Sequence, residues 1–201
     1  IPLRLNTPMA GLVTNDEGRV IGVEIETSGR KEVLRARKGV ILATGGFENN
    51  PEMRSHYQPL VGHGWSVASP DNTGDGQRAA RDIGAKLELM DEAWWYPLIS
   101  LPQGLSGGTM ERKSPGQFIV NGAGQRFANE CAPYTELGKI QIVEHAKGVQ
   151  HIPAWMIIDE KTWRTNIFCG NFPGSAFPSE WLESGHAYRA ETIAELARKI
   201  G

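Results

Sequence analysis

The sequence predicts an α/β domain joined to an α+β domain, and three observations lead to this fold class. Short β-branched runs separated by turn residues fill the start of the chain, a continuous apolar run at 40–43 ends in paired glycines, and helix and strand patterns alternate over the second half. A short, continuous apolar run is typical of a strand buried on both faces of a parallel sheet. We place the domain boundary so that residues 1–88 form the first domain and residues 89–201 the second.

The first domain is expected to open with an antiparallel β-meander that has one apolar face. Its strands are expected at residues 3–5, 9–14, 20–25 and 33–34. Turn-forming residues at 15–18 and 28–29 separate these runs, which is the pattern of hairpins. The buried strand at 40–43 follows, then a short helix from Pro51 and a second helix that Gly84 ends.

The second domain is expected to mix helices with short strands. Its elements are expected as a hairpin of residues 117–121 and 125–128, a helix at 134–147, a strand at 155–158, a short helix from 160 and a final helix at 193–200. Asp159 is placed to cap the short helix, and Thr192 with Glu195 forms a capping box at the start of the final one.

Composition and charge argue against several classes of function. The 201 residues are 40% hydrophobic and 22% charged, with a net charge of −2 and no block of like charges. A protein that binds nucleic acid through the phosphates normally carries a basic patch. No apolar run reaches the ~18 residues of a membrane span, and the chain starts without the layout of a signal peptide. The sequence therefore indicates a soluble cytoplasmic domain with no nucleic-acid partner and no membrane span.

Metal, thiol and hydrolase chemistry are not indicated either. Cys131 and Cys169 belong to no CxxC pair, and the five histidines give no helical pair of ligands, so no metal site is expected. Neither cysteine has a histidine near it in sequence, so no thiol nucleophile for hydrolase chemistry is expected. The chain opens without methionine inside a strand-like run, so we interpret it as a fragment of a longer protein.

Two glycine-rich segments are the first candidates for a ligand site. Residues 74–79 match G-x-G-x-x-A by letter, but turn formers rather than an apolar strand precede them, so we reject a dinucleotide fingerprint. From the residues alone, a helix start capped by Thr73 or Asp75 is the favoured interpretation. Residues 43–46 follow the expected buried strand, where paired glycines suit either close approach of a ligand or a tight turn.

Four aromatic residues are candidates for a substrate pocket. Trp94, Trp95 and Tyr96 form either pocket walls or core, and at least one must be exposed because consecutive side chains do not all face one way. Tyr134 stands at an expected helix start. A phenol, with an ordinary pKa of about 10, acts as a base only where its anion is stabilised. From the residues alone, a structural role for Tyr134 is therefore the favoured interpretation.

Three motifs in this chain occur in a recognisable order. They are ARKGVILATGGF at 36–47, NTGDG at 72–76 and GQRFANE at 124–130. They resemble segments of one flavoprotein family, which contains fumarate reductases, succinate dehydrogenase flavoprotein subunits, L-aspartate oxidases and 3-ketosteroid dehydrogenases. The resemblance covers essentially the whole chain. It implies part of an FAD-binding domain, with the meander and the parallel strand, joined to part of a capping domain that holds the substrate.

The resemblance assigns the cofactor FAD to particular residues of the first domain. The expected FAD contacts are Met9, Ala43, Thr44, Gly45, Gly46 and Asp75. The N-terminal G-x-G-x-x-G unit and the C-terminal glycine-rich segment of the family have no match in this sequence. We therefore expect this chain alone to bind FAD weakly or not at all.

The resemblance also separates branches of the family. Fumarate reductase-like members carry two arginines beyond the glutamate that matches Glu130, where this sequence has Pro133 and Ala154. Residues 129–134, NECAPY, instead resemble 3-ketosteroid dehydrogenases, which makes Tyr134 the expected catalytic base. The residues expected to bind substrate are Trp94, Trp95, Tyr96 and Glu130.

The implied activity is that of an FAD-dependent oxidoreductase that dehydrogenates the α,β carbons of a carbonyl compound. The substrate is expected to be a small apolar ketone such as a steroid, because aromatic side chains suit such a molecule better than a dianion. Two alternatives stay open at this point. One is a fumarate reductase-like enzyme acting on dicarboxylates, and the other is a non-catalytic module that keeps only the family scaffold.

Overall fold

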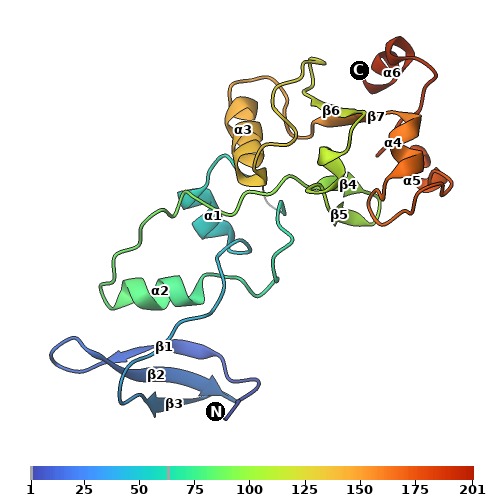
Figure 1. Ribbon diagram of the computed structural model, residues 1–201. Helices are drawn as coiled ribbons and strands as arrows, with labels where there is room; N and C mark the ends of the chain where they lie inside the picture. Colours follow the sequence, from blue (N-terminus) through green and yellow to red (C-terminus); the bar gives the residue numbers. More distant parts are fainter. Residues whose placement is uncertain (1, 63) are drawn as a thin grey trace. The chain divides into compact units, whose positions relative to one another are not determined.

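The computed structural model describes residues 2–62 and 64–201 and divides the chain into two compact units (Figure 1). Unit 1 contains residues 1–92 and unit 2 contains residues 93–201. Within the described residues, no helix has the length and apolar character that crossing a membrane requires.

An antiparallel β-meander opens unit 1, as the sequence predicts. Its strands β1 (Met9–Thr14), β2 (Val20–Thr27) and β3 (Arg30–Arg35) pair in that order. Gly18 and Gly29, both with positive φ, lie in the two turns. Ile25 of β2 is buried, and Gly22 lies so close to the carbonyl oxygen of Leu34 that any side chain at 22 would collide with it. The meander is therefore confirmed, with close contact between β2 and β3.

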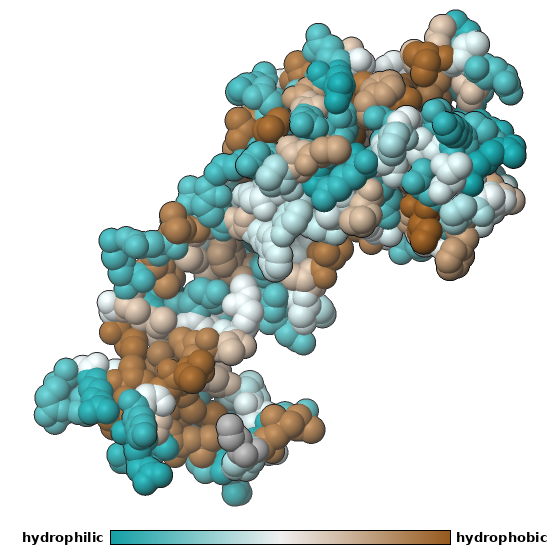
Figure 2. Space-filling model, in the orientation of Figure 1, coloured by the Kyte–Doolittle hydropathy of each residue, from teal (hydrophilic) through white to brown (hydrophobic). Residues whose placement is uncertain are grey.

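The strands expected at 3–5 and 40–43 are not formed. Neither segment pairs with another strand in the described part of the chain, and Ile41 is 93% exposed. A parallel strand needs neighbouring strands that satisfy its N–H and C=O groups. No strand of the described chain lies beside residues 40–43 to do so. The strand is therefore not formed among the described residues, and its place in a parallel sheet stays a prediction. Figure 2 shows apolar side chains gathered around the meander, and the exposed apolar residues of unit 1 include Leu3, Leu5, Val33 and Ile41.

Two helices follow the meander in unit 1, α1 (Pro51–Tyr57) and α2 (Asp75–Asp82). Asn50 caps α1 by accepting a hydrogen bond from the Met53 N–H at 3.0 Å. The N-cap of α2 is Gly74 in the left-handed conformation, with no side-chain cap. The expected cap by Thr73 or Asp75 is therefore wrong, because the Thr73 hydroxyl donates to the Asp75 carboxylate instead.

Unit 2 mixes short antiparallel sheets with helices. Its strands are β4 (Ile99–Leu101), β5 (Gly104–Ser106), β6 (Gln117–Val120) and β7 (Trp155–Ile158), which pair as β4–β5 and β6–β7. Its helices are the 3₁₀ helix η1 (Glu111–Lys113), α3 (Tyr134–Ala146), α4 (Glu160–Thr165), α5 (Ser179–Glu183) and α6 (Ile193–Ile200). Leu101, Trp163, Phe168 and Trp181 form its buried core.

Two helix starts in unit 2 confirm the predicted caps. The Asp159 carboxylate accepts from the Thr162 N–H at 2.7 Å at the start of α4, and the Thr192 hydroxyl accepts from the Glu195 N–H at 3.1 Å at the start of α6. Each bond satisfies one N–H group of a first helical turn. In a capping box, the carboxylate of Glu195 would accept from the N–H of the cap residue, Thr192. Here it accepts from the N–H of Glu191, one residue earlier, at 3.2 Å.

The hairpin expected after β6 is reduced to one bridge, between Val120 and Arg126, and residues 125–128 form no strand. β6 pairs along its full length with β7 instead. The N–H of Ile119 donates to the carboxylate of Glu130 at 2.9 Å. A side chain thus takes the N–H group that a longer hairpin would use, which explains why the prediction is wrong.

Candidate functional site

The two glycine-rich segments of unit 1 lie against each other. The N–H of Gly74 donates to the carbonyl of Gly46 at 3.0 Å. Thr44 lies beside Gly76, where an added side chain would overlap the Thr44 hydroxyl. The segments therefore form one structural feature, and we call residues 43–46 and 74–76 the glycine loops.

The glycine loops present backbone rather than side chains. Gly45 has a φ of +73°, and a side chain there would overlap the amide of Asn72. A side chain at Gly46 would overlap the carboxylate of Glu48. The exposed residues of the loops include Ala43, Thr44 and Gly45. Because glycine has no Cβ, a ligand can approach such a backbone closely.

Two buried oxygen atoms near the loops lack partners. Glu48 Oε2 and Gln77 Oε1 have no hydrogen-bond partner among the described residues, while the amide nitrogen of Gln77 donates to the Gly45 carbonyl at 3.1 Å. Buried acceptors in proteins normally have a donor. The hydroxyl groups of a ribose or a ribityl chain are donors of the kind these oxygens need. The residues present therefore fit FAD.

Asp75 and Met9 are the remaining residues expected at the cofactor. The Asp75 carboxylate is half-exposed and accepts from the Thr73 hydroxyl at 3.0 Å and from the Arg78 guanidinium at 2.6 Å. Met9 begins β1, opposite Ile25 of β2. The contacts of Asp75 and Met9 with FAD stay predictions.

Three of the four aromatic candidates come together at the start of α3. Tyr134, its first residue, is partly buried, and the indole N–H of Trp94 donates to its phenolic oxygen at 2.6 Å. The ring of Tyr96 meets that of Tyr134 edge-on, with centroids 5.4 Å apart. Trp94 is 80% exposed, which confirms that one of the three consecutive aromatic residues lies at the surface. We call Trp94, Tyr96 and Tyr134 the aromatic cluster.

Trp95 is not part of the aromatic cluster. It lies against Gly138 of α3, where an added Cβ would meet the Cβ of Trp95 at 3.0 Å. Its indole nitrogen is buried without a partner among the described residues. Trp95 therefore packs on α3, and its contact with substrate stays a prediction.

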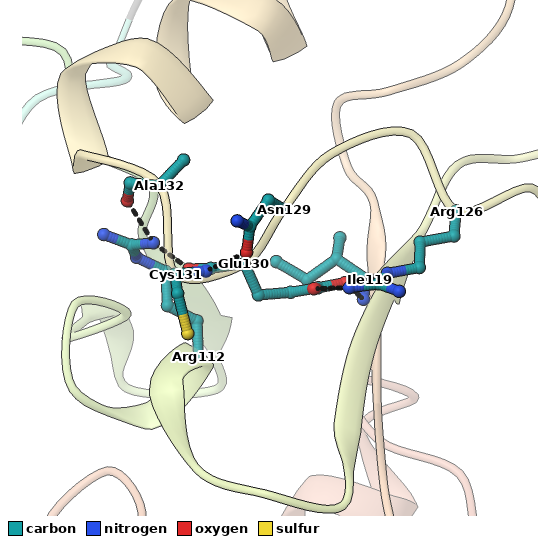
Figure 3. Close-up of polar contacts among 7 residues, drawn as sticks. All are labelled: Arg112, Ile119, Arg126, Asn129, Glu130, Cys131 and Ala132. Carbon is teal, nitrogen blue, oxygen red and sulfur yellow. Dashed lines mark hydrogen bonds and ion pairs between the residues drawn. The ribbon is translucent and has the colours of Figure 1, made fainter.

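Glu130 lies at the centre of a polar network that precedes α3 (Figure 3). Its carboxylate accepts from the Ile119 N–H at 2.9 Å and from two nitrogens of Arg126 at 3.0 and 2.6 Å. Burial raises the pKa of Glu130, but the hydrogen bonds from Arg126 and from Ile119 outweigh burial and hold the pKa below its usual value. Glu130 thus has a structural role in unit 2, and its contact with substrate stays a prediction.

Arg112 is a buried arginine that sequence reasoning missed. It lies in η1, is 1% exposed, and its Nη1 donates to the carbonyls of Glu130 and Ala132, the latter at 2.8 Å (Figure 3). Its Nε and Nη2 have no partner among the described residues. No local sequence pattern distinguishes Arg112 from the charged residues beside it, because its burial depends on the fold. Arg112 and Arg126 together hold the turn that leads to Tyr134.

The described chain holds two thiols and no cluster of metal-ligating side chains. Both cysteines are free, and Cys131 is exposed. Burial, with a smaller contribution from Glu111, raises the pKa of Cys169 to about 12, so its thiol is protonated at neutral pH. Within residues 2–62 and 64–201, no three His, Cys, Asp or Glu side chains are grouped so that they could hold a metal ion.

The chain resembles known proteins along its whole length. The model of a family described as FAD binding domain matches residues 1–198. The 3-oxosteroid 1-dehydrogenase of Mycobacterium tuberculosis (strain ATCC 25618 / H37Rv) is 43% identical over 212 residues, which cover 100% of this chain and 37% of that protein. The probable fumarate reductase Ifc3 of Shewanella frigidimarina (strain NCIMB 400) is 26% identical over 100% of this chain and 32% of its own length.

A solved structure matches the fold closely. It is the crystal structure of 3-ketosteroid delta1-dehydrogenase from Sterolibacterium denitrificans in complex with 1,4-androstadiene-3,17-dione, with a TM-score of 0.89 and 42% identity. The match covers 100% of this chain and 37% of that one, so this chain spans little more than a third of the ketosteroid dehydrogenases it matches. The expected flavoprotein family and its FAD-binding fold are thereby confirmed. The chain belongs to the FAD binding domain family, and its cofactor is FAD.

Proposed function

We propose that this chain belongs to an FAD-dependent oxidoreductase that dehydrogenates the α,β carbons of an apolar ketone such as a 3-ketosteroid. The observation that carries the proposal is the position of Tyr134, a partly buried phenol at the start of α3 in contact with Trp94 and Tyr96. Relatives named as ketosteroid dehydrogenases, at 43% and 42% identity, support the substrate class.

In this proposal residues 1–88 supply part of the FAD-binding domain, and residues 89–201 supply part of a capping domain that holds the substrate. Residues 43–46 of the glycine loops, Met9 and Asp75 contact FAD. The exposed backbone of the loops and the unpartnered oxygens of Glu48 and Gln77 support this assignment. FAD, when bound, accepts a hydride from one carbon of the substrate.

Tyr134 acts on the neighbouring carbon, which lies next to the ketone. Its phenolic oxygen takes a proton from that carbon, and the C–H electron pair becomes the new C=C bond as the hydride leaves the adjacent carbon. The substrate thus loses one proton and one hydride, which together carry two electrons. The ketone makes the first carbon acidic, and the rings of Trp94 and Tyr96 offer an apolar surface to the substrate.

A Tyr134→Phe variant of the whole protein tests the proposal. Loss of a positioned base slows turnover by about 10²–10⁴-fold, while the ring that remains leaves the flavin site intact. Turnover of a 3-ketosteroid is measured together with the flavin absorbance spectrum. Near-normal turnover with an unchanged spectrum would remove Tyr134 from the mechanism.

A dicarboxylate substrate has less support in unit 2. A dianion needs cationic partners, but Arg112 is buried and Arg126 is paired with the carboxylate of Glu130. Reoxidation of reduced flavin by fumarate, compared with a steroid enone, distinguishes the two substrates in the whole protein. Faster reoxidation by fumarate would favour the dicarboxylate enzyme. A whole protein lacking the G-x-G-x-x-G unit would instead favour the non-catalytic module.

A further inference from the structure

The hydrogen bond between Trp94 and Tyr134 has a defined direction. An indole nitrogen is only a donor, so the phenolic oxygen of Tyr134 accepts from the Trp94 N–H at 2.6 Å. This separation is short for an N–H···O bond. A phenolic oxygen has two lone-pair sites and one O–H group. Trp94 occupies one lone pair, which leaves the other lone pair and the O–H group for exchange with another molecule.

We infer that Trp94 is a positioning residue for proton transfer at Tyr134, an inference that rests on the proposed function. The indole N–H holds the phenolic oxygen in place and remains a donor to it when that oxygen is anionic. A hydrogen bond to a charged oxygen is roughly twice as strong as one between neutral groups. Trp94 therefore holds the oxygen of Tyr134 in one position for the proton transfer.

Two further contacts restrict the position of Tyr134. Its backbone is fixed at the first residue of α3, directly after a turn whose Glu130 and Ala132 carbonyls accept from buried Arg112. Its ring is held edge-on by Tyr96, with centroids 5.4 Å apart. Neither contact reaches the phenolic oxygen, so the Trp94 N–H is the described donor that acts on the reacting atom itself.

A Trp94→Phe variant of the whole protein tests this role, because it removes the N–H and keeps an aromatic ring. Trp94 is 80% exposed, so the variant is expected to fold. We expect kcat to fall roughly tenfold to hundredfold, somewhat less than the ~10²–10³ of a buried oxyanion-hole donor, with KM changed little. The substrate deuterium isotope effect at the carbon that loses the proton is expected to rise. Trp94→His, which restores a ring N–H, is expected to recover part of kcat.

Trp155→Phe is the matched control. Trp155 meets Tyr188 edge-on with centroids 5.5 Å apart, and no hydrogen bond joins the two side chains within the described residues. The same substitution in a second Trp–Tyr pair therefore changes an indole without removing a bond to a phenol. We expect Trp155→Phe to leave kcat and the isotope effect unchanged.

A double-mutant cycle with Tyr134→Phe separates this inference from the proposed function. If Trp94 acts through the phenolic oxygen, Trp94→Phe has no further effect on kcat once Tyr134→Phe is present. An equal loss in both backgrounds, a rise in KM alone, or a kcat within twofold of the unaltered protein would overturn the role of Trp94. Near-normal turnover of Tyr134→Phe by itself would instead overturn the proposed function.

Discussion

The two units hold their candidate sites in different ways. In unit 2, side chains fix the turn before Tyr134: Arg112 donates to two backbone carbonyls, and the Glu130 carboxylate accepts three hydrogen bonds. In unit 1, the glycine loops offer exposed backbone, and buried oxygens of Glu48 and Gln77 have no partner within the described chain. The proposed catalytic residue is thus positioned by unit 2 itself, whereas the groups that we propose as cofactor contacts in unit 1 leave hydrogen-bonding capacity free for a ligand.

The largest effect expected from this difference is in FAD binding. We expect the 201-residue chain to bind FAD weakly or not at all. The pyrophosphate of a dinucleotide is normally held at the helix N-terminus of a G-x-G-x-x-G unit, and this sequence has none that follows a strand. A flavin titration followed by absorbance measures the affinity.

The whole protein is the control for that titration and is expected to bind FAD stoichiometrically. Tight, one-to-one binding by the 201-residue chain would contradict the comparison, because the glycine loops would then suffice for the cofactor. Weak binding by both proteins would instead contradict the stoichiometric binding expected of the whole protein.

The next effect concerns Arg112 and the stability of unit 2. Arg112→Met keeps an unbranched apolar stem but leaves the carbonyls of Glu130 and Ala132 without their donor. A buried acceptor left without a partner costs about 1–3 kcal/mol in the free energy of unfolding. Because Nε and Nη2 of Arg112 are themselves unpartnered among the described residues, removing them offsets part of this cost. Chemical denaturation measures the net change.

Arg112→Lys and Arg126→Met are the matched variants for that measurement. Lys retains one donor for the carbonyls, so it is expected to lose less stability than Met. The Arg126 side chain is 59% exposed, so its loss is also expected to cost less. An Arg112→Met protein as stable as the unaltered one would show that the two carbonyls need no donor from Arg112.

Much of the fold is predictable from local patterns. The meander, α3 and the caps by Asp159 and Thr192 depend on residues near one another in sequence, and the structure confirms them. The strand expected at 40–43 is not formed among the described residues, because a parallel strand depends on neighbours from elsewhere in a sheet. The hairpin after β6 is wrong because the side chain of Glu130 takes the N–H of a strand residue.

The candidate site, like the fold, is predictable from sequence only where it depends on residues that are close together in the chain. The family motifs locate Tyr134 and the glycine loops, since each of them lies within a short continuous segment of the sequence. The sequence does not distinguish Trp94, which reaches Tyr134, from Trp95, which packs on Gly138, because that choice depends on how the chain approaches α3. Arg112 gives no signal at all, because its burial arises only when η1 meets the turn before α3.

The smallest effect is expected for Glu130→Gln. The amide keeps the shape of the carboxylate and one acceptor oxygen, but it loses the ionic hydrogen bonds from Arg126. We expect the free energy of unfolding to fall by about 1–2 kcal/mol at pH 7, a modest value because Arg126 is largely exposed to solvent. Glu160→Gln is the control, since Glu160 is half-exposed and its pair with Arg164 lies at the surface.

The pH dependence of that difference identifies Glu130 as its source. The pKa of Glu130 is lowered in the folded protein from its ordinary value of 4.5, so the folded state binds this proton less readily than the unfolded state. The stabilisation is therefore fully present above pH 4.5 and is lost as the pH falls through the folded pKa. Denaturation of the unaltered and Glu130→Gln proteins is expected to differ at pH 7 and to converge in acid. A difference that stays constant with pH would show that shape, rather than the charge of Glu130, holds the turn before Tyr134.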